Sequence, residues 1–315
     1  MFPNVPYVGY QGGFRTPFAT ILPPGGRVAA YVRSTGPADY DDQIVGSRLV
    51  TTLAAALGKV RAGKGDTVVV LPGHSESVTT ATMLANLVNG TRIIGMGNPM
   101  QDDAPTFRWT DAAGEWAIDN KNTVISGLRL RLEGANGITK AINITAAGCT
   151  LRDCVIQTAS GASNKATIAV EVGSTATECT IQNNYIYGSA THNSTDVIKV
   201  VGATVPSQLR VLDNTAFCSA TAANGILHVT VAALNMEIAR NTFFNTHTAS
   251  TAAIAIDNVA ASGICAYNNL ATINDGVATA QGLTQGAGSL VRSFQNFSCD
   301  EPIKSGVLTP AVVAT

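Results

Sequence analysis

An internal repeat of 26–30 residues limits what this chain can fold into more than any other feature. A six-residue pattern recurs in which an aliphatic residue, a turn residue and an apolar residue take the first, fourth and sixth places, as in the segment from Ile181 to Ile186. The fourth places lie 26, 30, 30, 27 and 27 residues apart and are occupied by Leu128, Cys154, Asn184, Asn214, Asn241 and Asn268. A repeat of this length is typical of solenoids, in which each unit buries its apolar face against the next.

A second β-run lies inside each unit, with spacings of 26, 30, 28 and 28 residues. Its members are INI at 142–144, IAV at 168–170, IKV at 198–200, ILH at 226–228 and IAI at 254–256. Both runs alternate apolar with variable residues, as strands with one buried face do. A leucine-rich repeat needs its own leucine signature and a helix in each unit, and the sequence has neither. We therefore predict an all-β parallel β-helix over residues 63–299, with about 26–30 residues per coil.

The composition agrees with stacked β-structure and excludes two classes of partner. Charged residues make up 13% of the chain, about half of the roughly 25% in an average soluble domain, and the net charge is −1. The chain has no basic excess for nucleic acid and no cationic patch for an anionic membrane, so we expect neither partner.

The N-terminal residues and the cysteines indicate whether the protein crosses a membrane and whether its thiols are oxidised. The chain has no cationic start followed by an apolar run and no apolar stretch of about 18 residues, so we expect it to act without crossing a membrane. Its six cysteines show no C-x-x-C spacing, which favours reduced, buried thiols. Cys149 and Cys179 each lie five residues before the turn position and should share one internal stack. Buried thiols are favoured there over a disulfide.

The asparagines of the turn position predict a structural ladder. Asn184, Asn214, Asn241 and Asn268 should stack in consecutive coils, where Asn tolerates left-handed backbone and its amide bonds to the Asn one coil along. This signal is structural and not catalytic.

The chain before the repeat divides into two predicted segments. Residues 1–41 are rich in proline and form an extended arm, with Phe2, Tyr7, Tyr10, Phe14 and Phe18 as its docking aromatics. These rings either pack on their own domain or dock on another subunit. Residues 42–62 carry an apolar stripe at helical spacing, which predicts a helix of about five turns. Residues 300–315 form a C-terminal tail.

One motif near this helix is a decoy. Residues 58–64, GKVRAGK, match most of a phosphate-binding loop. Gly65 replaces the required Ser or Thr, and a helix precedes the motif where a strand is needed, so we expect no nucleotide there.

Three segments carry a resemblance to a known superfamily. GDTVVVLPGH at 65–74, IIGMG at 93–97 and VISGL at 124–128 resemble the opening coils of the pectate-lyase-like right-handed β-helix superfamily. With the repeat, the resemblance covers roughly residues 63–298. It implies a right-handed β-helix with residues 42–62 as a helix that caps the first coil. It does not specify a function, because members include polysaccharide lyases, hydrolases, phage tailspikes and inert virion proteins.

The residues give little support for the superfamily's chemistry. Its lyases hold calcium in a carboxylate cluster and use an Arg or Lys base, whereas its hydrolases use Asp residues on neighbouring coils, about 5–10 Å apart. Here Asp153 and Asp213 lie two coils and about 10 Å apart, and Glu171 with Asp196 is the other pair. We expect the histidines at 74, 192, 228 and 247 to be ordinary side chains without metal or catalytic partners.

Two tryptophans are the last candidate site residues in the sequence. Trp109 and Trp116 could stack a sugar, although packing is the expected role. We expect no catalytic residue, metal or cofactor.

These features together resemble a bacteriophage virion protein. The resemblance implies a non-enzymatic homotrimer that decorates or cements the capsid surface, is assembled in the host cytoplasm and contacts the major capsid protein through its arm. One alternative is a tailspike or tail-fibre component that binds or cleaves host polysaccharide. Another is a bacterial lyase or adhesin that acts outside the cell.

Overall fold

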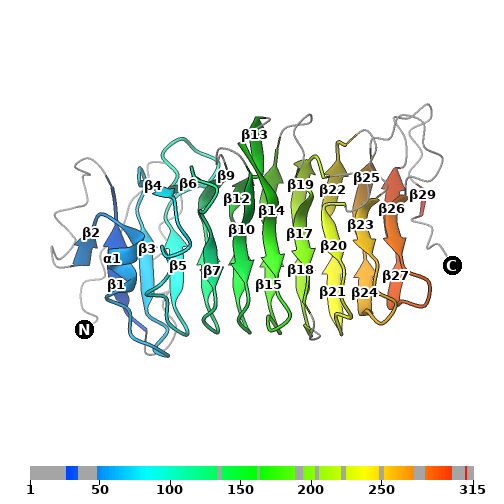
Figure 1. The fold of residues 1–315 in the computed structure, drawn as a ribbon, viewed down its shortest axis with the longest axis horizontal. Coiled ribbons are helices and arrows are strands. Elements are labelled where there is room, and N and C mark those ends of the chain that lie inside the picture. The colour runs from blue at the N-terminus through cyan, green and yellow to red at the C-terminus, as the bar shows by residue number, and fades with distance from the viewer. Residues whose placement is uncertain are drawn as a thin grey trace, which may run out of the picture.

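The structure, a computed structural model of the 315-residue chain, describes ten segments. They are residues 26–34, 48–132, 137–161, 164–188, 194–202, 206–220, 225–247, 252–272, 281–299 and 309–310. The described residues form a right-handed parallel β-solenoid made of three long sheets, A, B and C. Figure 1 shows the coils stacked along the long axis, from the N-terminal end in blue to the C-terminal end in red.

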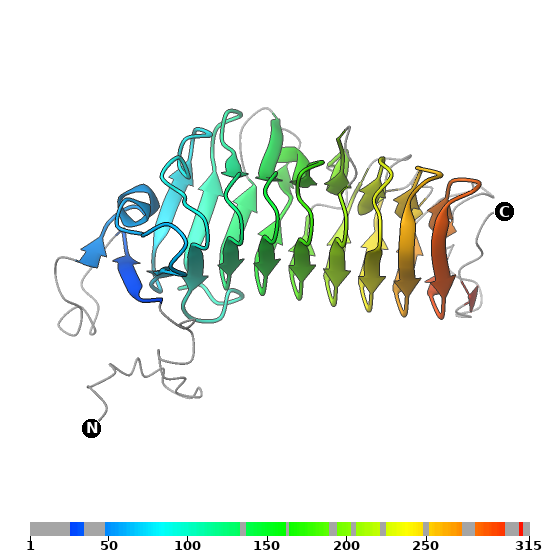
Figure 2. The ribbon, with the colours of Figure 1, turned by 90° about the horizontal axis from the view of Figure 1, so that it is seen from below.

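From β5 onward, each coil passes through the three sheets in the same order. A strand of sheet A leads by a tight turn to sheet B, then to sheet C, and a second turn returns the chain to sheet A one coil further along. Neighbouring strands are parallel except for two antiparallel pairs described below. The view in Figure 2, turned by 90°, shows the same strands side by side along the molecule.

Sheet A contains the aliphatic first position of the six-residue repeat pattern. In spatial order its strands are β2 (Leu49–Val50), β1 (Val28–Val32), β3 (Thr67–Val70), β5 (Arg92–Gly95), β8 (Val124–Ser126), β11 (Thr150–Arg152), β15 (Thr180–Gln182), β18 (Arg210–Leu212), β21 (Met236–Ala239), β24 (Ser262–Ala266) and β27 (Leu290–Phe294).

Sheet B follows sheet A in every coil. From the N-terminal end its strands are β4 (Ser75–Val78), β6 (Thr106–Trp109), β9 (Arg129–Leu132), β12 (Val155–Gln157), β16 (Tyr185–Tyr187), β19 (Thr215–Cys218), β22 (Thr242–Asn245), β25 (Asn269–Thr272), β28 (Phe297–Cys299) and β29 (Thr309–Pro310). β29 is antiparallel to β28, so a piece of the predicted tail belongs to the sheet.

Sheet C closes each coil. Its strands are β7 (Trp116–Ile118), β10 (Ile138–Ile144), β14 (Asn164–Val172), β17 (Asp196–Val200), β20 (Leu227–Val229), β23 (Ala252–Ile256) and β26 (Gln281–Gln285), and β13 (Ala159–Gly161) pairs antiparallel with β14. The predicted all-β parallel β-helix is confirmed.

The register confirms one repeat column and corrects the other. In sheet A, Ile181 pairs with Leu151 and Val211 at the predicted spacing. In sheet C, Ile142 pairs with Val170 and not with Ile168, and Ile198 pairs with Leu227 and not with Ile226. A shift of one residue reverses the faces of a strand, and the corrected register of β20 places His228 on the outer face.

The N-terminal end also differs from the prediction. Within the predicted arm, Val28–Val32 forms the buried strand β1, which pairs with β3. Of the helix predicted over 42–62, the part described from residue 48 on contains only α1 (Leu53–Leu57), preceded by β2. α1 begins where the Oγ1 of Thr52 accepts a hydrogen bond from the amide of Ala55 at 3.3 Å, and it ends at Gly58. The five arm aromatics, Phe2, Tyr7, Tyr10, Phe14 and Phe18, lie outside the described residues.

The interior is one continuous apolar core. Stacked aliphatic side chains fill most coils, and α1 adds Leu53 and Leu57 to the same cluster. In the early coils the filling is aromatic: the ring of Trp116 lies 4.8 Å from that of Phe107 and 5.1 Å from that of Trp109. The stacking of like side chains on like follows from the parallel register.

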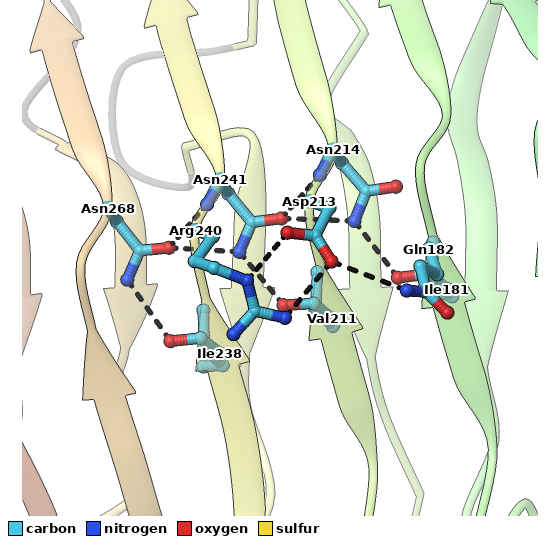
Figure 3. Close-up of polar contacts among 9 residues, drawn as sticks. All are labelled: Ile181, Gln182, Val211, Asp213, Asn214, Ile238, Arg240, Asn241 and Asn268. Atoms are coloured by element: carbon cyan, nitrogen blue, oxygen red, sulfur yellow. Dashed lines mark hydrogen bonds and ion pairs between the residues drawn. The ribbon is translucent and has the colours of Figure 1, made fainter.

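A ladder of buried asparagines lines the turn between sheets A and B (Figure 3). It contains the four predicted residues and a fifth, Asn296. The Oδ1 of Asn241, for example, accepts hydrogen bonds from the backbone amide and the Nδ2 of Asn214, both at 3.0 Å. The Nδ2 of Asn241 donates to the carbonyl of Val211 at 2.8 Å and to the Oδ1 of Asn268 at 2.9 Å. Each of the four predicted rungs therefore joins three coils.

The left-handed backbone of this turn lies one residue earlier than predicted. Positive φ angles of 51–70° belong to the residue before each turn position, namely Gly127, Asp153, Asn183, Asp213, Arg240, Tyr267 and Gln295. The recurrence of asparagine at this position of the coil is therefore explained by its side-chain hydrogen bonds and not by a need for positive φ.

Replacing Asn241 with Ala should destabilise the solenoid by about 3 kcal/mol, because the amide of Asn214 and the carbonyl of Val211 both lose a buried partner. Urea unfolding followed by circular dichroism measures the change. The matched control is Asn269→Ala on the exposed face of β25, which should change stability by less than about 0.5 kcal/mol. Equal effects of the two variants would refute a stabilising ladder.

Candidate functional site

Three side chains from consecutive coils meet on the outer face of sheet C. The Nδ1 of His228 lies 2.7 Å from the Oδ1 of Asp196, and its Nε2 lies 2.7 Å from the Oδ2 of Asp257. Asp196 begins β17, His228 is the middle residue of β20, and Asp257 directly follows β23. Both ring nitrogens of the histidine are thus occupied by carboxylates.

The strands fix this arrangement through their alternation. Leu227 and Val229 point into the core, so His228 between them points outward. The side chain of Asp196 is fully buried, that of His228 is 7% exposed, and that of Asp257 is 59% exposed. The Nζ of Lys199 lies 3.0 Å from the Oδ2 of Asp196 and supplies a second positive charge to the buried carboxylate.

This geometry favours a charged imidazolium. Burial opposes the charge on His228, but hydrogen bonds and charge interactions with Asp196 and Asp257 outweigh it, so the pKa of His228 is raised above its ordinary value. A histidine that donates from both nitrogens holds its neighbours together and has no lone pair for a substrate proton. The cluster therefore acts as an ionic bridge across three coils.

The predicted pair Glu171 and Asp196 lies on neighbouring coils of the same face. Ile168, and not Glu171, is the register partner of Asp196, and Glu171 lies opposite Lys199. The Oε1 of Glu171 is 3.2 Å from the Nζ of Lys140. Each carboxylate is therefore matched with a lysine, and the pair is spread along the strands.

The other predicted pair, Asp153 and Asp213, lies in the turn between sheets A and B. The Oδ1 and Oδ2 of Asp213 are 2.7 and 3.0 Å from the guanidinium of Arg240, as Figure 3 shows. The hydrogen bond to Arg240 is the main reason that the pKa of Asp213 lies below its ordinary value. Asp153 accepts a hydrogen bond from the Nδ2 of Asn183 at 2.6 Å. A general acid needs a raised pKa, so Asp213 does not have the property required of the acid in an inverting pair.

Comparison with known proteins gives no family for this arrangement. No protein-family model matches the chain, and no curated protein is similar to it in sequence.

The described residues also give no sign of a metal site or of a membrane-spanning helix. They contain no group of three or more His, Cys, Asp or Glu side chains arranged to hold a metal ion. None of the helices in the described part of the chain has the length and apolar character to span a membrane.

The remaining sequence candidates have structural roles. Trp109 and Trp116 are fully buried, so the predicted alternative of a sugar-stacking platform is wrong. The decoy loop at 58–64 connects α1 to β3, and its Arg61 binds the buried Asp66, with Nη2 and Oδ1 2.7 Å apart. Hydrogen bonds from Arg61 hold the pKa of Asp66 at about 2.

The histidines were predicted to be ordinary surface or satisfied side chains, and the two carboxylates that satisfy His228 were not identified from the sequence. Asp196 and Asp257 stand 32 and 29 residues away, which is close to one coil on either side. A search for residues one coil apart could have found them. The error of one residue in the register of β20 concealed the contact. His74 also has a partner, since its Nε2 lies 3.2 Å from the Oε2 of Glu76.

The His228 bridge predicts a defined pH dependence of stability. Because the folded-state pKa is raised, the stabilisation is complete below the ordinary value of 6.5 and is lost as pH rises through the folded-state value. The wild-type melting temperature, measured by circular dichroism, should fall between pH 6.5 and the alkaline range. His228→Gln should melt lower at acidic pH and lack this component.

A control separates this effect from general titration. His247→Gln should keep the wild-type pH profile above pH 6.5, because burial lowers the pKa of His247 and keeps it uncharged in the folded protein over this range. The bridge is disproved if wild type and His228→Gln lose stability in parallel over this range.

Proposed function

We propose that this chain is a non-enzymatic structural subunit that associates laterally with copies of itself, as a homotrimer decorating a bacteriophage capsid. The observation that carries the proposal is a set of exposed apolar side chains on β24 and β27, the last two strands of sheet A, and on the residue directly after β24. This terminal apolar patch consists of Ile264, Tyr267, Leu290 and Phe294.

The side chains of this patch are well exposed to water. Tyr267 is 52% exposed, Phe294 44% and Leu290 69%. The rings of Tyr267 and Phe294 meet edge to face with centroids 5.7 Å apart, so they form a preorganised apolar surface. Contiguous apolar patches on a monomer mark contact surfaces, and a second copy of this chain is the occupant that we propose.

The capsid contact is assigned to residues 1–25 on the basis of their sequence. Their aromatic side chains gain by burial on a partner, and several arms on one trimer would bind a lattice of capsid subunits with avidity. The carboxylates of the solenoid support a structural role as well. Asp196, Asp213 and Glu171 all neutralise neighbouring cations.

Light-scattering mass tests the lateral contact. The full-length chain should have three times the 32.5 kDa chain mass, and the double variant Tyr267→Ser, Phe294→Ser should be monomeric. The matched control is Phe217→Ser, which should stay trimeric. Phe217 is an aromatic side chain on another face, and it is 42% exposed. A monomeric wild type rules out the trimer. A variant that lacks residues 1–25 keeps β1. It should remain trimeric and lose co-sedimentation with undecorated phage capsids.

A second candidate function, binding of host polysaccharide, is favoured by one observation on sheet B. Tyr187, Phe217 and Phe244 occupy the same outward position in three consecutive coils. The rings of Phe217 and Phe244 lie 5.9 Å apart. Gln157 precedes Tyr187 in this column, and its Oε1 accepts a hydrogen bond from the Tyr187 hydroxyl at 3.2 Å. Aromatic faces beside amide and hydroxyl groups suit an extended neutral glycan.

Affinity electrophoresis in gels that contain bacterial surface polysaccharides tests this candidate. The double variant Tyr187→Ala, Phe217→Ala should lose at least about tenfold in affinity, since stacking on each ring contributes on the order of 1 kcal/mol. Phe294→Ala should bind like wild type. Retardation that is equal in all three proteins would show that the sheet B column is not the binding surface.

A further inference from the structure

Two cysteines occupy the same position in consecutive coils, at the turn that leads from sheet C to sheet A. Cys149 directly precedes β11, and Cys179 directly precedes β15. Their following residues, Thr150 and Thr180, are register partners in parallel strands. The amide of Thr180 donates to the carbonyl of Cys149 at 2.9 Å, so the two backbones are joined at this point. Adjacent parallel strands lie about 4.8 Å apart, which is within the Cα separation of about 4.4–6.8 Å that a disulfide spans.

The two side chains also point the same way. Each cysteine follows a residue with positive φ, Gly148 at 70° or Glu178 at 57°. Each thiol is buried and donates to a carbonyl of the preceding coil, the Sγ of Cys149 to Asn120 at 3.4 Å and the Sγ of Cys179 to Ala146 at 3.3 Å. Parallel side chains on adjacent strands bring the two sulfur atoms next to each other.

The two thiols differ in acidity. A hydrogen bond from Cys179 is the largest cause that lowers the pKa of Cys149, whereas the same bond and burial raise the pKa of Cys179. Because the two cysteines are adjacent, either can resolve the other once it is oxidised, and the lowered pKa favours Cys149 as the thiolate that reacts first.

The other described thiols provide a contrast within the same molecule. The register partners of Cys265 are Ile238 and Ser293, and that of Cys218 is Asn245. Burial raises the pKa of Cys154, Cys218 and Cys265 to about 12 each. Among the cysteines with described side chains, adjacency and acidity thus coincide at Cys149 and Cys179.

We infer that Cys149 and Cys179 form a modification site at which a small peroxide closes a disulfide between consecutive coils. The Cys149 thiolate attacks one oxygen of hydrogen peroxide and the O–O bond breaks. Hydroxide is the leaving group, and Cys149 becomes a sulfenic acid. The Cys179 sulfur then attacks the sulfenic sulfur, the S–O bond breaks, and the thiol proton leaves with the hydroxyl as water. The two sulfurs lose two electrons in total, and the peroxide is reduced to two waters. The bond would add a covalent cross-link between consecutive coils that are otherwise joined by the main chain and by non-covalent contacts.

The test uses the purified full-length protein, fully reduced and then exposed to hydrogen peroxide. After denaturation and alkylation, the number of alkylated cysteines should fall from six to four, and peptide mapping should show Cys149 linked to Cys179 in one chain. The disulfide should raise the melting temperature by about 5 °C, because it restricts the unfolded chain. Reduction with dithiothreitol should reverse both changes.

Two variants make the result specific. Cys149→Ser should keep Cys179 alkylatable after peroxide, whereas Cys265→Ser should still form the linkage. The inference fails if all six cysteines stay alkylatable in wild type, if the mapped linkage joins other cysteines or two chains, or if peroxide yields only overoxidised Cys149. Because the wild-type peptide map decides on its own, misfolding of a variant leaves the outcome readable.

Discussion

The in-register hydrogen bonding of consecutive coils is the constraint from which the rest of this structure follows. Parallel strands in three sheets hold each coil about 4.8 Å above the last, so every side chain meets its equivalent one coil away. A buried amide such as that of Asn241 satisfies its neighbours because they are amides as well, and a buried charge such as Asp196 is tolerated because a cation arrives from the next coil. Favourable and unfavourable neighbours alike repeat with the period of the coil.

This constraint explains which parts of the fold the sequence could predict. The turn between sheets A and B has a fixed length, so the spacing of Asn184, Asn214 and Asn241 identified both the repeat and the ladder. The connection from sheet B to sheet C changes in length from coil to coil, and spacing alone therefore misplaced Ile168 and Ile226 in sheet C. The error was small in residues and large in consequence, since it concealed the His228 bridge.

The ends of the solenoid were harder to predict because they lack neighbours on one side. β1 was interpreted as part of an arm, since a single strand before the first full repeat has no periodic partner in the sequence. The stripe from Leu49 to Leu57 has helical spacing, yet Leu49 and Val50 join sheet A beside β1. Pairing with an existing strand edge outweighs their helical preference, which is weak for the β-branched Val50. Tertiary context decided both cases.

The antiparallel strand β29 changes what the C-terminal end of the molecule can do. A further parallel coil, whether from this chain or from another copy, needs the edges of all three sheets at once. In the described part of the chain, β27 and β26 end sheets A and C as parallel strands, but β29 lies across the end of sheet B with the opposite direction. End-to-end stacking of molecules would therefore lose one side of the triangular coil. Continued stacking of parallel coils is therefore disfavoured at this edge of sheet B, where the last strand runs in the opposite direction.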